Sequence, residues 1–244
     1  MNDRSSTPPR DAATASVLAE RAFARATGAV AVSGNDVRLL LDSKENYPAW
    51  LAAIASAQST IRFETYIIAD DATGVLFTDA LCERSRKGVQ VFALFDWLGS
   101  HGASRLFGLL RDAGVHVRIF NPPNLADPLG WITRNHRKTI TVDDRIAFVS
   151  GLCVSDKWNG NPARQMQPWR DTGIEIIGPS VADVARAFDD VWRTCAGAAA
   201  LPAPIVPEPR VGHVTARVVE GVPNHTGTYR LDLAIASLAR RYLW

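Results

Sequence analysis

Between residues 37 and 120 the chain alternates short apolar runs, typical of strands, with longer amphipathic segments, typical of helices. The same pattern resumes after residue 138 and continues to residue 195. Strands and helices that take turns at this spacing indicate a layered α/β fold with a central sheet flanked by helices. The predicted strands are 37–41, 61–68, 89–95, 115–120, 138–142, 146–149 and 174–177, and the predicted helices are 48–57, 74–87, 104–113 and 181–195.

Composition limits the functional classes. With 47% hydrophobic and 21% charged residues among 244, the chain can bury the core of one large domain or two small ones, which excludes disorder as its main state. A formal net charge of +2 does not favour a dedicated nucleic-acid coat protein. The three cysteines are widely spaced and form no CxxC pair, which argues against a disulfide framework or a cysteine zinc site and suits a reducing compartment.

The termini predict the domain organisation. Residues 1–35 are rich in Ala, Ser, Thr and Arg and are expected to form a mobile arm with one short helix near residues 16–26. The early charges and prolines predict no Sec-type signal peptide, and the longest apolar stretch, residues 195–206, is too short to cross a bilayer. A proline-rich linker is expected at 201–212. The main folded part is thereby placed at 36–200.

Residues 213–244 resemble the start of the folded part. Ile54-Ala55-Ser56 matches Ile235-Ala236-Ser237 at an offset of 181 residues. The match predicts the beginning of a second, incomplete copy of the domain. Chance similarity between two alanine-rich amphipathic helices is the alternative.

One motif carries the chemistry. His136, Lys138 and Asp143 have the spacing HxKxxxxD. Side chains two apart on a strand share a face, so His136 and Lys138 are expected to project together while Arg137 points the other way. An imidazole beside an ammonium on one rigid strand predicts a site for an anion.

The sequence resembles the phospholipase D superfamily, most closely its bacterial cardiolipin synthase-like branch. The matching blocks are IRFETYIIADD (61–71), GVQVFALFDWLGS (88–100), the motif segment 134–143, IAFVSG (146–151) and WRDTGIEIIGPSV (169–181). The resemblance implies a phospholipase D-like layered fold with a mixed sheet, one full copy plus the start of a second. It also implies that two HxKxxxxD copies meet, that one histidine forms a phosphohistidine, and that the other protonates the leaving alcohol. No metal and no cofactor are expected.

The resemblance assigns the catalytic roles residue by residue. His136 would act as nucleophile or acid, and Lys138 would balance charge on the phosphate oxygens. Asp171 stands where the family has a carboxylate that orients the histidine ring.

The remaining site residues are expected to support these three. Asp143 sits at a turn and is expected to be structural, while Glu64 could support the site or form a core salt bridge. Ser150, Gly151 and Cys153 form the neighbourhood of the phosphate site. Cys153 stands where the family usually has Asn, and a thiol is a weaker donor, so the resemblance is less close there.

The expected function is cardiolipin synthase-type phosphatidyl transfer or phospholipid hydrolysis on an anionic, phosphatidylglycerol-like lipid at a membrane surface. The protein would act peripherally on the cytoplasmic side of the inner membrane, or be secreted without a recognisable signal. One motif supplies half an active site, so a missing second half or a homodimer mate is expected. A single-motif homodimeric nuclease or phosphodiesterase and an inactive truncated remnant are the alternatives, and nucleic acid is the less favoured partner.

Overall fold

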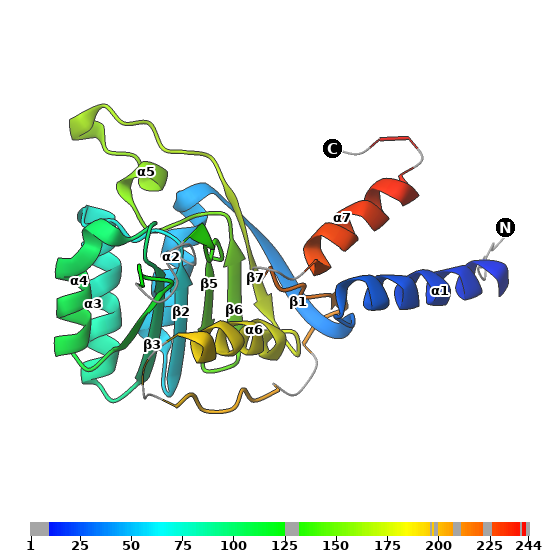
Figure 1. Ribbon diagram of the computed structural model, residues 1–244, viewed down its shortest axis with the longest axis horizontal. Coiled ribbons are helices and arrows are strands. Elements are labelled where there is room, and N and C mark those ends of the chain that lie inside the picture. The colour runs from blue at the N-terminus through cyan, green and yellow to red at the C-terminus, as the bar shows by residue number, and fades with distance from the viewer. Residues whose placement is uncertain are drawn as a thin grey trace, which may run out of the picture. The chain divides into compact units, whose positions relative to one another are not determined.

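The computed structural model describes residues 10–124, 132–195, 197, 200–206, 211–221, 226–239 and 241–242 (Figure 1). Outside this part lie Trp131, His225 and residues 207–210 of the predicted linker. The chain forms two compact units, Ser33–Thr215 and Met1–Val32 with Ala216–Trp244.

The larger unit is built on an eight-stranded mixed sheet, which confirms the predicted α/β class. Strands β2, β3 and β4 run parallel, and antiparallel pairs join β2 to β5, β5 to β6, β6 to β7 and β7 to β1. The strand order is β4-β3-β2-β5-β6-β7-β1-β8. The bounds are β1 (Val32–Leu41), β2 (Thr60–Thr65), β3 (Gln90–Asp96), β4 (His116–Phe120), β5 (Thr139–Val142), β6 (Ile146–Ser150), β7 (Thr172–Ile177) and β8 (Val214–Ala216).

Helices cover both faces of the sheet, and alternate residues of β2 show how the faces differ. Phe63 packs against Phe77 on one face, while its neighbour Arg62 reaches Asp189 on the other. The first face is covered by α2 (Asp42–Ser56), α3 (Ala72–Arg86) and α4 (Ser104–Asp112), and the second by α6 (Val181–Thr194). Shorter helical segments are η1 (His101–Ala103), α5 (Asp156–Asn159) and η3 (Pro162–Arg164).

The face under α2, α3 and α4 holds the aromatic core. Tyr47, Trp50 and Phe77 pack edge-on or tilted with centroids 5.3 to 6.1 Å apart, and Phe63 and Phe95 extend the cluster across β2 and β3. All five rings are buried. Their burial holds the three helices against the sheet.

The face under α6 is instead held by charge. The guanidinium of the buried Arg62 pairs with Asp144 at 2.6 Å and with Asp189 at 2.8 Å, and it donates to the carbonyl of Pro202 at 2.8 Å. A buried charge needs such partners, because desolvation of an unpaired ion is expensive. The backbone N–H of Ile205 also donates to Asp144, so the segment after α6 is fastened to this face.

The predicted elements of the larger unit are present, with shifted ends. The predicted helix at 48–57 starts six residues earlier, at Asp42, so Pro48 lies inside it. Proline there removes the backbone donor that would otherwise reach the carbonyl of Lys44, one turn earlier. The predicted strand 61–68 ends at Thr65, after which Ile68 forms only an isolated bridge with Val154.

The smaller unit pairs α1 (Arg10–Thr27) with α7 (Gly227–Leu238). Arg217, which follows β8, donates to the carboxylate of Glu20 on α1 and to the carbonyl of Ala29 just after that helix. The repeat-like residues 235–237 fall in the last turn of α7, as residues 54–56 fall in the last turn of α2. Assignment of residues 213–244 to a second copy stays a prediction. Within the described residues, no helix is both long and apolar enough to span a bilayer.

Candidate active site

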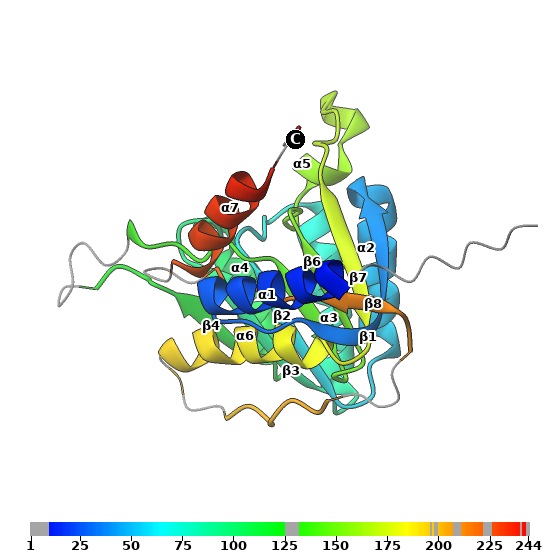
Figure 2. The same cartoon turned by 90° about the vertical axis from the view of Figure 1, so that its right-hand side faces the viewer.

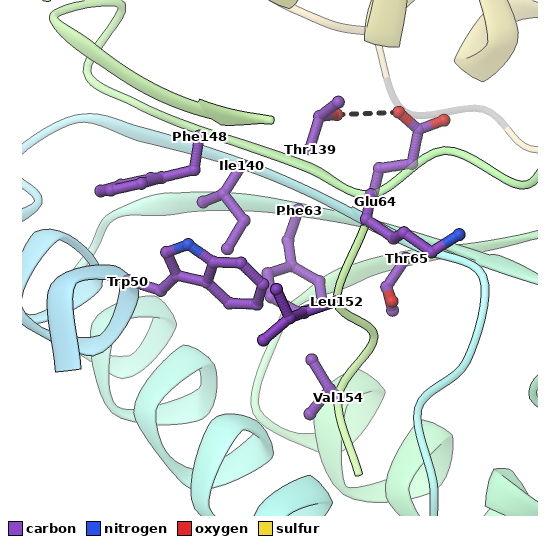
Figure 3. Close-up of a pocket in the computed structure, with 10 residues that line it drawn as sticks. Trp50, Phe63, Glu64, Thr65, Thr139, Ile140, Phe148, Leu152 and Val154 are labelled. Carbon is purple, nitrogen blue, oxygen red and sulfur yellow. Dashed lines mark hydrogen bonds between the residues drawn. The ribbon is translucent and has the colours of Figure 1, made fainter. Parts of the chain in front are cut away.

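The motif segment is held by its odd-numbered residues. Glu64, at the end of β2, accepts hydrogen bonds from the Asn135 amide at 2.6 Å, the Arg137 guanidinium at 2.9 Å and the Thr139 hydroxyl at 2.8 Å. Figure 3 shows the bond between Thr139 and Glu64. Because residues two apart share a side, these bonds leave the even-numbered His136 and Lys138 to face the other way. Glu64 is thus a buried ion-pair partner of Arg137 that also bonds the motif segment, and its role in the site stays a prediction.

Asp96 holds the residue before the histidine. Its carboxylate, at the buried end of β3, accepts a hydrogen bond from the backbone N–H of Asn135 at 2.9 Å and another from the Arg134 guanidinium at 3.2 Å. The same carboxylate caps the following turn by accepting the backbone N–H groups of Leu98 and Gly99. Asp96 is not among the residues predicted from the sequence. Its signal was an acidic residue closing an otherwise apolar run, QVFALFD.

Tyr66 contacts both motif side chains. Its ring centroid lies 4.6 Å from that of His136, and the Lys138 ammonium lies 5.4 Å from the Tyr66 ring. The Tyr66 carbonyl accepts the Ser100 hydroxyl at 2.9 Å, and a side chain on Gly99 would come within 2.1 Å of that carbonyl oxygen. Tyr66 was also missed from sequence, because an aromatic residue next to a strand is ordinarily read as core.

The electrostatics favour a neutral imidazole. Burial lowers the pKa of His136 below its ordinary value of about 6.5, the Lys138 ammonium lowers it further, and Asp96 opposes both. Burial also lowers the pKa of Lys138, against the charges of groups that include Asp171 and Glu64. The ammonium donates to the carbonyl of His136 at 2.5 Å. The site therefore places an uncharged nitrogen base next to a fixed cation at neutral pH.

Asp171 lies beside this pair without bonding to the histidine. Its carboxylate accepts the Trp158 indole N–H at 3.3 Å and the backbone N–H of Thr172 at 2.8 Å. It lies directly over Gly151, where a Cβ would come within 2.0 Å of a carboxylate oxygen. Among the described residues none forms a hydrogen bond with the His136 ring. The orienting role of Asp171 therefore stays a prediction.

Cys153 is buried next to Lys138. Burial raises the pKa of the Cys153 thiol, and the Lys138 ammonium lowers it in part. The carbonyl of Cys153 accepts the Tyr47 hydroxyl at 2.6 Å. Ser150, on β6, accepts the backbone N–H of Leu152 at 3.0 Å and so shapes the turn that carries Gly151.

Asp143, the last residue of the motif, lies at the opposite end of β5 from Lys138. Its carboxylate accepts the backbone N–H groups of Gln58, Ser59 and Thr60 at 2.8 to 2.9 Å, and the Ser59 hydroxyl at 2.8 Å. Burial alone would raise the pKa of Asp143, but these hydrogen bonds outweigh it and lower the pKa. The geometry is that of a turn-fastening residue.

A small cavity lies beneath the site. It has a volume of about 10 Å³ and is lined by Lys138, Glu64 and apolar side chains that include Trp50, Phe63 and Leu152 (Figure 3). A space of that size holds about one water molecule, so a substrate has to reach His136 from the solvent side. In the described part of the chain, His, Cys, Asp and Glu side chains form no group of three able to hold a metal.

The larger unit is a layered α/β fold in which His136 and Lys138 lie next to each other just before β5. Comparisons with known proteins find similar sequences and structures. Residues 50–160 match the family model described as "Cardiolipin synthase, PLD-like domain". The chain is 35% identical over 168 residues to cardiolipin synthase A of Pseudomonas putida strain F1, and 36% identical over 169 residues to that of Pseudomonas entomophila strain L48. Each match covers 66% of this chain and 34% of the relative.

Solved structures show the same fold at lower identity. The phospholipase D family member Nuc from Salmonella typhimurium superimposes with a TM-score of 0.52 at 17% identity, covering 66% of this chain and 97% of Nuc. Phosphatidylserine synthase from Haemophilus influenzae superimposes with a TM-score of 0.53 at 15% identity, covering 70% of this chain and 40% of the synthase.

The chain belongs to the phospholipase D superfamily, in its cardiolipin synthase-like branch. It spans about a third of the length of the curated cardiolipin synthases that it matches.

Proposed function

We propose that this chain carries one half of a phosphodiester-processing active site that acts on anionic phospholipids, by cardiolipin synthase-type phosphatidyl transfer or by hydrolysis. The observation that carries the proposal is the pairing of His136 and Lys138 on one side of a segment fixed by Glu64 and Asp96. Such a fixed pair suits a reaction at phosphorus, because the nucleophile and the balancing charge are positioned before the substrate arrives.

In the proposed reaction, a ring nitrogen of His136 attacks phosphorus and the bond from phosphorus to the leaving alcohol breaks. The alcohol leaves with a proton supplied by a second acid. An acceptor alcohol, or water, then attacks the phosphohistidine, transfers its proton to the same group and releases His136. Lys138 stabilises negative charge on the phosphate oxygens during both steps, and loss of one such preorganised donor typically costs about 2.7–4 kcal/mol. Asp171 is assigned to orienting the imidazole.

The second acid has to come from outside the described site, because no second histidine in the described residues contacts His136. We assign it to a second HxKxxxxD half, either in the same polypeptide or in a homodimer mate. An apolar strip beside the site supports this assignment. Leu39 and Leu41 on β1 are 59% and 47% exposed, and β1 leads directly to Asp42, whose backbone N–H donates to the carbonyl of Asp171 at 2.8 Å.

A single-motif phosphodiesterase or nuclease acting as a homodimer is the second candidate. It is favoured by the 97% coverage of Nuc, a structure about as long as the matched part of this chain. The lipid reaction is preferred, because identity to the cardiolipin synthases is 34 to 36% but identity to Nuc is 17%. An inactive remnant is the outcome if neither activity is found even after a second half has been added. For the lipid reaction we place the protein peripherally at the cytoplasmic face of the inner membrane.

The test is turnover by the chain and by His136→Ala on phosphatidylglycerol vesicles and on DNA, with molar mass measured by light scattering. Lipid turnover that disappears in His136→Ala supports the proposal, and its dependence on dimer concentration would assign the second acid to a mate. DNA cleavage that disappears instead would favour the nuclease. If neither substrate is processed, adding a separately produced second half shows whether the chain supplies a competent half-site.

A further inference from the structure

Residues 157–170 form a projection next to the active site, here named the rim loop. Figures 1 and 2 both show this segment, which begins within α5, extending beyond the sheet and the other helices of the larger unit. Residues 162–165 and 167–170 are all exposed, and Met166 between these two stretches is half-buried.

The rim loop has a defined internal structure. Asn161 and Met166 exchange backbone hydrogen bonds of 2.9 and 3.0 Å, and the Asn161 side chain donates to the buried carboxylate of Asp156 at 2.9 Å. The two ends of the loop are joined by the backbone N–H of Trp169, which donates to the carbonyl of Lys157 at 2.8 Å. A loop this well bonded presents its outer side chains in a fixed arrangement.

Those outer side chains combine apolar groups with cations. Pro162, Pro168 and Trp169 face solvent, and Trp169 is 53% exposed. The segment contains no Asp or Glu, and it carries Lys157 and Arg164 as exposed cations. Its third cation, Arg170, is paired with Asp42 at 2.7 Å, so its charge is balanced within the protein. Exposed tryptophan beside lysine and arginine is the composition found where proteins meet an anionic bilayer surface.

The rim loop is also connected to the site. The Trp169 ring packs against Trp158 with centroids 5.2 Å apart, and the Trp158 indole donates to the Asp171 carboxylate at 3.3 Å. A surface that binds Trp169 therefore lies close to the groups expected to handle phosphate.

We infer that the rim loop docks the active site onto an anionic lipid bilayer, with Trp169 entering the headgroup region and Lys157 and Arg164 facing lipid phosphates. The inference rests on the proposed function for its purpose, because a lipid site has to meet its substrate at the membrane. A nucleic acid fits the loop less well. The Lys157 ammonium lies 5.4 Å from the Trp169 ring centroid, over a ring face that base stacking would need.

The test is co-sedimentation with vesicles of phosphatidylcholine alone and of phosphatidylcholine mixed with phosphatidylglycerol. The chain should bind only the mixed vesicles. Trp169→Ala should weaken binding about tenfold, and each of Lys157→Gln and Arg164→Gln about fivefold. Two matched controls should bind as the unchanged chain does. Leu76→Ala removes an equally exposed apolar side chain on α3, at 52%, and Arg111→Gln removes an exposed cation from α4.

Three results would overturn the inference. These are absence of binding to mixed vesicles, equal binding by the loop variants and the controls, and loop variants that lose DNA binding but keep vesicle binding. Circular dichroism of each variant excludes misfolding as the cause. Failure of the proposed function looks different. In that case the loop-dependent binding to vesicles is found, but no lipid turnover that depends on His136.

Discussion

The backbone N–H of Asn135 donates to the buried carboxylate of Asp96 at 2.9 Å, so β3 fixes the chain one residue before the histidine of the motif. The same carboxylate fixes the turn that cradles Tyr66, whose ring contacts that histidine. His136 is thus positioned from both sides by one acidic group.

Asp96→Asn should therefore impair both stability and turnover. The carboxylate accepts from several donors, including Arg134, and an amide nitrogen would oppose some of them. We expect a loss of about 2–4 kcal/mol in the free energy of unfolding and at least about a tenfold fall in turnover. Urea unfolding measures the first. Asp190→Asn, which breaks the exposed pair with Arg193, should cost less than about 1 kcal/mol, and equal losses in both variants would contradict the role of Asp96.

Gly151→Ala tests whether the position of Asp171 matters. The new Cβ would come within 2.0 Å of an Asp171 carboxylate oxygen and so displace it. Turnover should fall about tenfold or more, and Asp171→Asn should give the same loss. Gly108→Ala is the matched control, because nothing lies within 4 Å of a Cβ there. Because Gly108 lies in helix α4, this substitution should raise the free energy of unfolding by up to about 1 kcal/mol and leave turnover unchanged. Full activity in Gly151→Ala would remove Asp171 from the proposed site.

The pKa of His136 can be measured directly. Burial and the Lys138 ammonium lower it, so its ring proton resonances should titrate below about 6.5 in an NMR titration. Lys138→Gln should raise the pKa and Asp96→Asn should lower it. A folded-state pKa below the unfolded value means that the unfolded chain binds more protons, so this histidine should reduce stability as pH falls through about 6.5. A pKa above 6.5 in the unchanged chain would contradict the neutral-imidazole assignment.

Asp143→Asn should separate structural from catalytic roles within the motif. The carboxylate fastens residues 58–60, so the variant should lose about 1–3 kcal/mol at neutral pH while turnover changes less than about twofold. The folded-state pKa is lowered, so the stabilisation exists above the unfolded value of about 3.9 and is lost as pH falls through the folded value. The two proteins should therefore converge in acid. A large loss of turnover with intact stability would return Asp143 to the catalytic group.

Sequence periodicity predicted the sheet, because apolar residues recur differently in strands and in helices and the apolar runs were long enough to tell the two apart. It misplaced the start of α2, since a proline usually opens a helix, but Pro48 is tolerated inside this one. The HxK spacing identified His136 and Lys138. It could not identify Tyr66 or Asp96, because each acts through a contact that is distant in sequence. Tyr66 contacts His136, 70 residues later, and Asp96 accepts from Asn135, 39 residues later.

The pattern in which Glu64 binds residues 135, 137 and 139 has a consequence for protein engineering. To transfer this site to another protein, the motif segment has to be moved together with the strand that carries the acid. A grafted His-x-Lys segment alone lacks the acidic neighbour that decides which of its side chains face the site. A scaffold that offers such an acid on the adjoining strand should accept the motif. One without it would present arginine where the imidazole belongs.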